Sequence, residues 1–88
     1  MADIIKRATA GTMESSDAYV EISPAEGLEI SLESVVQKQF GSAIEAVISD
    51  VLAECKVANA KVTVIDKGAL DCVIRARVET AVMRGRGE

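Results

Sequence analysis

The sequence predicts a small α+β fold, in which two helices pack on one face of an antiparallel or mixed sheet. Some segments alternate apolar and polar residues with a period of two, whereas two longer segments carry apolar residues at steps of three and four. The expected order of elements is β-β-α-β-α, with or without an extra N-terminal strand. The 88 residues suffice for a single domain, 1–88, and we expect 1–8 and 84–88 to be frayed.

The first two strands are expected at 18–23 and 28–33, where apolar and polar side chains alternate. A proline and a glycine lie between these segments, so we expect them to form an antiparallel hairpin. Residues 9–13 are a weaker candidate strand. Polar residues 14–17 follow, which are typical of a turn and place Ser15 at an exposed tip.

A first helix is predicted to start near Ser34, since Ser34 and Gln37 have the spacing of a capping box. Its apolar stripe comprises Val36, Phe40, Ile44, Val47, Ile48, Val51, Leu52 and Cys55. Gly41 interrupts the pattern, and Ser42 with Glu45 offers a second capping box. We favour one continuous helix in which Gly41 allows close packing; the alternative is a kink at this glycine.

A third strand is predicted at 61–65, because this short segment is rich in β-branched residues. Asp66 is then the expected N-cap of the last helix, with Asp71 in the first turn near the positive helix end. Its buried face is predicted to contain Leu70, Val73, Ile74, Val78, Ala81 and Val82. Asp71, Arg75 and Glu79 have the spacing of an ion-pair ladder along the exposed face.

Composition argues against an autonomous enzyme. The chain has no histidine, the commonest general base and zinc ligand. Cys55 and Cys72 form no Cys-x-x-Cys motif, so we expect two buried, reduced thiols. We find no signal peptide and no apolar run long enough for a spanning helix, and we expect a cytoplasmic protein without a membrane partner.

Charge is unevenly distributed along the chain. Residues 1–54 contain ten acidic and three basic side chains, whereas 55–88 contain four acidic and seven basic ones. The acidic part suits basic partner proteins. The arginines near the C-terminus lie among apolar helix positions without aromatic neighbours, so we expect no nucleic acid partner. Arg75 and Arg77 are expected on opposite sides of their helix.

Three segments carry a resemblance to a known family. They are Ala-Gly-Thr-Met-Glu-Ser-Ser-Asp at 10–17, Gln-Lys-Gln-Phe-Gly-Ser-Ala-Ile at 37–44 and Asp-Lys-Gly-Ala-Leu-Asp-Cys-Val-Ile-Arg-Ala-Arg-Val-Glu at 66–79. Together they resemble the acyl carrier subunit of bacterial citrate lyase, its gamma chain, over nearly the whole sequence. Met13 stands where leucine is common in that family, a change that should have little effect.

The resemblance implies that Ser15 is the attachment site of 2'-(5''-phosphoribosyl)-3'-dephospho-CoA, linked through a phosphodiester. Ser16 occupies a position where family members vary. Such a serine should be exposed, mobile and flanked by small polar residues. No histidine or adjacent lysine is present to take the proton of Ser15, so we expect this serine to be modified by another enzyme.

The resemblance also implies the reaction and the partners. A non-catalytic carrier would bring an acetyl or citryl thioester to two catalytic subunits, the alpha subunit (acyl transferase) and the beta subunit (citryl lyase). Their combined reaction cleaves citrate to acetate and oxaloacetate. A prosthetic-group transferase would load the arm onto the carrier.

Five further residues are candidate contacts of the arm or of partners: Glu14, Asp17, Asp66, Lys67 and Asp71. The favoured alternative for Asp66 and Asp71 is structural, as a helix cap and as a charge at the helix end. Two other functions are alternatives. One is the carrier of malonate decarboxylase, which uses the same kind of arm, although the segment 66–72 argues against it. The other is a small interaction or RNA-binding module.

Overall fold

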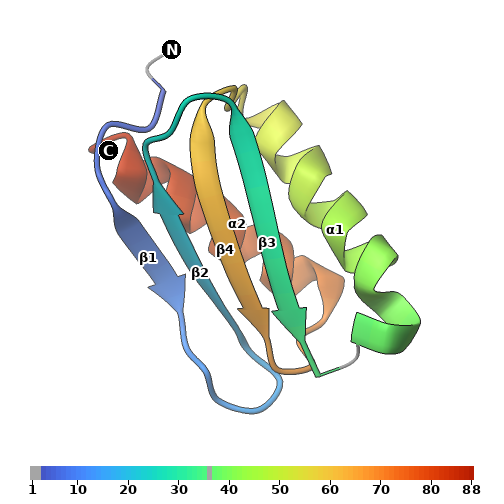
Figure 1. Ribbon diagram of the computed structural model, residues 1–88. Coiled ribbons are helices and arrows are strands. Elements are labelled where there is room, and N and C mark those ends of the chain that lie inside the picture. The colour runs from blue at the N-terminus through green and yellow to red at the C-terminus, as the bar shows by residue number, and fades with distance from the viewer. Residues whose placement is uncertain (1–2, 36) are drawn as a thin grey trace.

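A computed structural model describes residues 3–35 and 37–88, with the side chains of 37–40 left out of the description. The elements are β1 (Ala8–Gly11), β2 (Ala18–Ser23), β3 (Leu28–Ser34), α1 (Gln37–Glu54), β4 (Ala60–Asp66) and α2 (Asp71–Gly85). The predicted α+β class is confirmed, and the short first strand is present (Figure 1).

The four strands form one mixed sheet in the order β1-β2-β4-β3. β2 pairs antiparallel with β1 and with β4, whereas β3 pairs parallel with β4. The predicted hairpin between β2 and β3 is therefore wrong, because β4 lies between them (Figure 1). The connection from β3 to β4 passes through α1, as a parallel pair requires a long crossover.

β4 lies in the interior of the sheet, between β2 and β3. Along this strand Ala60, Val62, Val64 and Asp66 are buried, alternating with more exposed residues. Such a strand gains most from a neighbour on each edge, where its backbone N–H and C=O groups are paired on both sides. The more exposed β3 takes the edge of the sheet.

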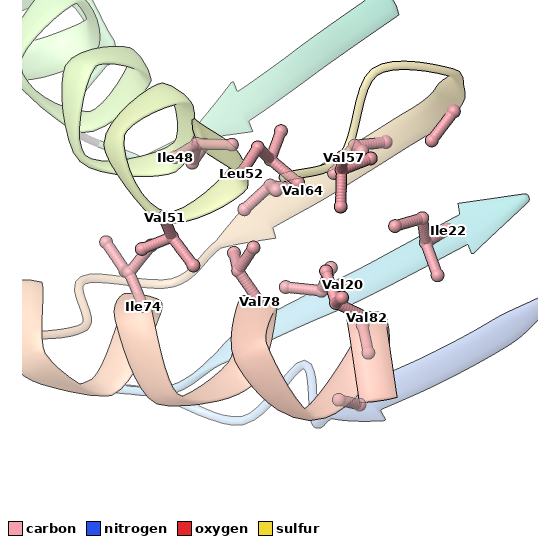
Figure 2. Close-up of a cluster of buried hydrophobic side chains, with 14 of the residues drawn as sticks. Val20, Ile22, Ile48, Val51, Leu52, Val57, Val64, Ile74, Val78 and Val82 are labelled. Carbon is pink, nitrogen blue, oxygen red and sulfur yellow. The ribbon is translucent and has the colours of Figure 1, made fainter. Parts of the chain in front are cut away.

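Both helices contribute to a hydrophobic core on one face of the sheet (Figure 2). Its largest fully buried apolar side chains are Val20, Ile22, Ile48, Val51, Leu52, Val62, Val64, Ile74, Val78 and Val82. Most of the predicted helix faces are thus confirmed, but Val73 is only half-buried and Leu70 is 71% exposed. The side chains of Val36 and Phe40, which the prediction included, lie outside the described residues.

α1 is one helix from Gln37 to Glu54 and continues through the buried Gly41. The favoured continuous helix is confirmed. Its predicted capping box is not, because Ser34 is the last residue of β3 and its hydroxyl donates to Asp66 at 2.7 Å. Pairing of β3 with β4 brings these two side chains together, which the local sequence does not reveal.

α2 begins at Asp71, five residues after Asp66, so Asp66 is not its N-cap. The predicted acidic residue in the first turn is confirmed. Arg75, expected in a ladder along α2, donates to Glu54 of α1 at 2.8 and 2.9 Å. This bond is the main reason why the pKa of Arg75 is raised, and the charge of Glu79 adds to it.

The end of α2 contacts the segment before β1. The carbonyl of the buried Gly85 accepts hydrogen bonds from the N–H groups of Ile5 and Lys6, at 2.9 and 3.2 Å. Arg86 donates to the carbonyl of Cys55. Fraying of 1–8 and 84–88 stays a prediction. The hydrogen bonds of Ile5, Lys6 and Arg86 argue against it for these residues.

Cys55 and Cys72 are both free thiols, but only Cys55 is partly buried. Burial raises its pKa. The expectation of two buried thiols is wrong for Cys72, which lies on the exposed side of the first turn of α2. Neither α1 nor α2, the helices within residues 3–35 and 37–88, is long and apolar enough to cross a membrane.

Candidate functional site

Ser15 lies in the loop between β1 and β2, at one end of the sheet (Figure 1). The N–H of Asp17 donates to the carbonyl of Glu14 at 3.1 Å and closes a turn around Ser15 and Ser16. Ser16 has a φ of +65°, a left-handed value that type II turns require at their third residue. The side chain of Ser15 is exposed, as predicted.

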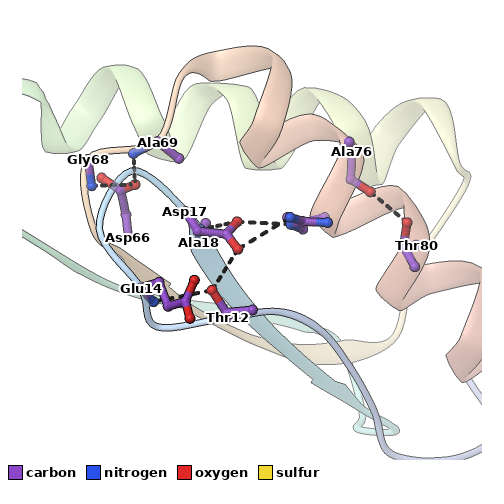
Figure 3. A network of polar contacts seen from close by, with 10 residues as sticks. Thr12, Glu14, Asp17, Ala18, Asp66, Gly68, Ala69, Ala76 and Thr80 are labelled. Carbon is purple, nitrogen blue, oxygen red and sulfur yellow. Dashed lines mark hydrogen bonds and ion pairs between the residues drawn. The ribbon is translucent and has the colours of Figure 1, made fainter.

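The carboxylate of Asp17 holds this loop to α2 and to the preceding loop residues (Figure 3). Arg77 donates through Nε to Oδ1 at 2.9 Å and through Nη2 to Oδ2 at 3.2 Å. Thr12 donates to Oδ2 and the N–H of Ala18 to Oδ1, both at 2.7 Å. Arg77, then Thr12 and Ala18, hold the pKa of Asp17 well below its ordinary value. The carboxylate is therefore an anchor and a poor general base.

A second set of bonds joins the Ser15 loop to the loop between β4 and α2. The N–H of Ser16 donates to the carbonyl of Lys67 at 2.8 Å, and the N–H of Lys67 donates to the carbonyl of Asp17 at 2.9 Å. These bonds extend the pairing of β2 and β4 beyond its last pair, Ala18 and Asp66. The backbone after Ser15 is thus more firmly held than the polar sequence predicts.

Gly11 determines how the chain enters the loop. Its φ is +84°, and a Cβ atom at this position would lie 1.9 Å from the carbonyl oxygen of Ala18. Only glycine permits this backbone conformation together with so close an approach. This role of Gly11 was not predicted, although a glycine at the end of a short strand is a sequence signal for it.

Asp66 is a structural residue at the base of the same end of the sheet. Its side chain is buried, at 1% exposure, and accepts hydrogen bonds from the N–H groups of Gly68 and Ala69 at 3.2 and 2.8 Å (Figure 3). The hydroxyl of Ser34 donates to its other oxygen at 2.7 Å. Asp66 therefore joins β3, β4 and the following loop, instead of capping α2 as predicted.

The remaining candidate residues lie in the same two loops and at the start of α2. Glu14 and Asp71 are exposed, and Lys67 is half-buried beside the backbone of Ser16. Arg77 was not predicted as part of this site. The prediction that Arg77 and Arg75 lie on opposite sides of their helix is confirmed, since they contact Asp17 and Glu54 respectively.

The site presents a serine that has no histidine beside it. The sequence contains no histidine, and the nearby carboxylate of Asp17 already accepts four hydrogen bonds. Within residues 3–35 and 37–88, we find no group of cysteine, aspartate and glutamate side chains suited to a metal ion.

Comparison with known proteins identifies the class of protein first. Residues 5–85 match a family model of acyl carrier proteins, described as "Malonate decarboxylase delta subunit (MdcD)". One chain of the crystal structure of a Pseudomonas malonate decarboxylase hetero-tetramer in complex with malonate has a similar fold. Its TM-score is 0.78 and its identity 23%, over 90% of this chain and 82% of that chain.

Relatives of higher sequence identity show to which family of acyl carrier proteins the chain belongs. A citrate lyase acyl carrier protein of Haemophilus influenzae is 53% identical, over 97% of this chain and 90% of its own length. One of Escherichia fergusonii is 55% identical, over 93% and 87%. One of Albidiferax ferrireducens is 53% identical, over 97% and 89%. The chain belongs to the family of citrate lyase acyl carrier proteins.

Proposed function

We propose that this chain is the acyl carrier subunit of a citrate lyase, and that Ser15 carries its prosthetic group. It is a carrier and not itself an enzyme. The proposed group is 2'-(5''-phosphoribosyl)-3'-dephospho-CoA, joined to Ser15 through a phosphodiester. The observation that carries the residue assignment is the turn at 14–17, which exposes Ser15 while hydrogen bonds hold the backbone beside it.

The residues present fit such a group. A covalent arm that must reach into other subunits needs an exposed attachment point, and Ser15 is exposed at the tip of its loop. Ser16 is exposed as well, but its backbone is left-handed and its N–H is bonded to the carbonyl of Lys67, so it is held more firmly than Ser15. The contacts of Asp17 and Asp66 are internal, which leaves Glu14, Lys67 and Asp71 as the proposed contacts of the arm or of partners.

The chain's own contribution is to hold the attached group where the catalytic sites can reach it. When attached, the group supplies a thiol that holds the acyl unit as a thioester. The hydrogen bonds of Asp17 keep the base of the arm in one place relative to the sheet. Tethering raises the concentration of the acyl unit at each catalytic site, which can reach the mM range for a short flexible tether. We propose the alpha and beta subunits of citrate lyase as the owners of those sites, and a prosthetic-group transferase as the loading enzyme.

The attachment site is tested by mass spectrometry of the subunit isolated in its complex from the native host. We expect an added mass equal to the phosphoribosyl-dephospho-CoA group, located on Ser15 by fragmentation. Ser15→Ala should fold normally and remain unloaded, whereas Ser16→Ala should still be loaded. Loss of the group in Ser16→Ala alone, or a native subunit that never carries a group, would overturn the proposal.

The carrier of malonate decarboxylase is the second candidate, because the family model and the similar crystal structure bear that description. Identities of 53–55% to citrate lyase acyl carrier proteins favour citrate lyase. Activity of the purified native complex distinguishes them. We expect cleavage of citrate, and decarboxylation of malonate instead would support the second candidate.

A further inference from the structure

Each of three connections at the Ser15 end of the sheet exposes one large apolar side chain. Met13 lies in the β1–β2 loop and is 54% exposed, Val35 follows β3 and is 64% exposed, and Leu70 precedes α2 and is 71% exposed. Hydrogen bonds between these connections keep them together. The N–H of Val35 donates to the carbonyl of Asp66 at 3.2 Å, and Ser16 and Asp17 are bonded to Lys67.

Leu70 occupies a position where a different type of residue would stabilise the helix more. It is the N-cap of α2, where serine, threonine, aspartate and asparagine are preferred because their side chains accept a hydrogen bond from the helix. Leu70 makes no such bond, and its side chain is not buried in the core. A leucine here contributes neither to capping nor to the core, so its apolar side chain is available for a contact with another molecule.

The chemistry of attachment at Ser15 indicates which protein contacts Leu70. An enzyme that forms a bond to the hydroxyl of Ser15 must bring its reacting atoms within bonding distance of it. The rim of its active site must then cover the neighbouring loops, including Met13. The catalytic subunits, in contrast, act on the acyl unit at the far end of the arm, and the length of the arm separates that unit from these loops.

The charged side chains at the Ser15 end of the sheet indicate what kind of protein surface would bind there. Glu14 and Asp71 are exposed acids and Lys67 is a half-buried base, whereas the cation of Arg77 is already bonded to Asp17. A complementary rim would carry apolar side chains flanked by lysine or arginine.

We propose that Met13, Val35 and Leu70, which we call the apolar loading surface, bind the active-site rim of the enzyme that attaches the prosthetic group to Ser15. This inference rests on the proposed attachment at Ser15. Glu14 and Asp71 complement cationic residues of that rim. The surface is specific to loading and is not the docking site of the catalytic subunits.

The test is the loading kinetics of the full apo chain with the purified transferase and its activated prosthetic-group donor. In a variant carrying Met13→Ser, Val35→Ser and Leu70→Ser, we expect KM for the carrier to rise by about tenfold with kcat nearly unchanged. Leu70→Ser alone should raise KM while the melting temperature stays equal or increases, because serine caps α2. Added salt should raise KM of the wild-type chain.

Met83→Ser is the matched control, since Met83 is 53% exposed on α2 outside these connections. It should load like the wild type. Unchanged KM in the triple variant would overturn the apolar loading surface. Normal loading combined with slower citrate cleavage by a complex of preloaded triple variant would also overturn it, and would assign these residues to the catalytic subunits. If the wild-type chain itself is not loaded at Ser15, the proposed attachment fails and this inference fails with it.

Discussion

Arg77 of α2 forms a two-pronged contact with Asp17, a residue that lies 60 positions earlier in the chain. Its Nε and Nη2 atoms lie 2.9 and 3.2 Å from the two carboxylate oxygens. Because Thr12 donates to the same carboxylate, the contact links the helix to both sides of the turn that presents Ser15. The conformation of the attachment loop is therefore coupled to the packing of α2 on the sheet.

Arg77→Ala should impair loading of Ser15 more than it impairs folding. Without the guanidinium, the turn loses its bond to α2 and Ser15 samples other positions, so kcat/KM for loading should fall on the order of tenfold. Amide hydrogen exchange at Ser16 should become faster. Arg75→Ala is the control, because Arg75 contacts Glu54 away from the loop, and it should load normally. Equal loading by both variants would show that the Asp17 contact does not position Ser15.

The ion pair between Arg77 and Asp17 should persist at acidic pH. Because Arg77 lowers the pKa of Asp17 in the folded chain, the stabilisation is fully present above the ordinary aspartate pKa. It is lost only as the pH falls through the lowered value of the folded state. Carboxylate chemical shifts should therefore report an ionised Asp17 at about pH 3, below the ordinary aspartate range. In Arg77→Ala the titration should move upward, and an unchanged midpoint would contradict this assignment.

Gly11→Ala should be strongly destabilising. The new methyl group would meet the carbonyl of Ala18 in a left-handed backbone, and we expect a loss of more than about 3 kcal/mol in the free energy of unfolding. Gly27→Ala is the matched comparison, since Gly27 has a φ of +76° with open space around it. It should cost only about 1 kcal/mol. Urea unfolding measures both, and similar losses would contradict the proposed clash.

Asp66→Ala should reduce stability and should have no direct effect on the chemistry of the arm. It leaves the half-buried hydroxyl of Ser34 and the N–H groups of Gly68 and Ala69 without this acceptor, at a cost of about 3 kcal/mol. Asp66→Asn retains one oxygen acceptor and should cost about 1 kcal/mol. Urea unfolding tests the order of the two variants. Slower loading by Asp66→Asn without any loss of stability would instead indicate a direct contact with the arm.

The local sequence determined the elements and the site loop of this protein. Period-two alternation located β2 and β3, and the apolar steps of three and four located both helices. The polar run at 14–17 was sufficient to predict an exposed turn at Ser15. These features depend on neighbouring residues, whose spacing alone decides which side chains share a face.

Tertiary structure alone decided which distant residues became neighbours. Alternation in β2 is the same whether β3 or β4 lies beside it, so strand order could not be read from the pattern. Asp66 had the spacing of a helix cap, yet the parallel pairing of β3 with β4 placed Ser34 beside it. Arg77 could reach Asp17 only once α2 had packed on the sheet, because their separation in sequence leaves no local signal. Local patterns are compatible with several orders of the strands. The order that forms is the one that buries the whole core.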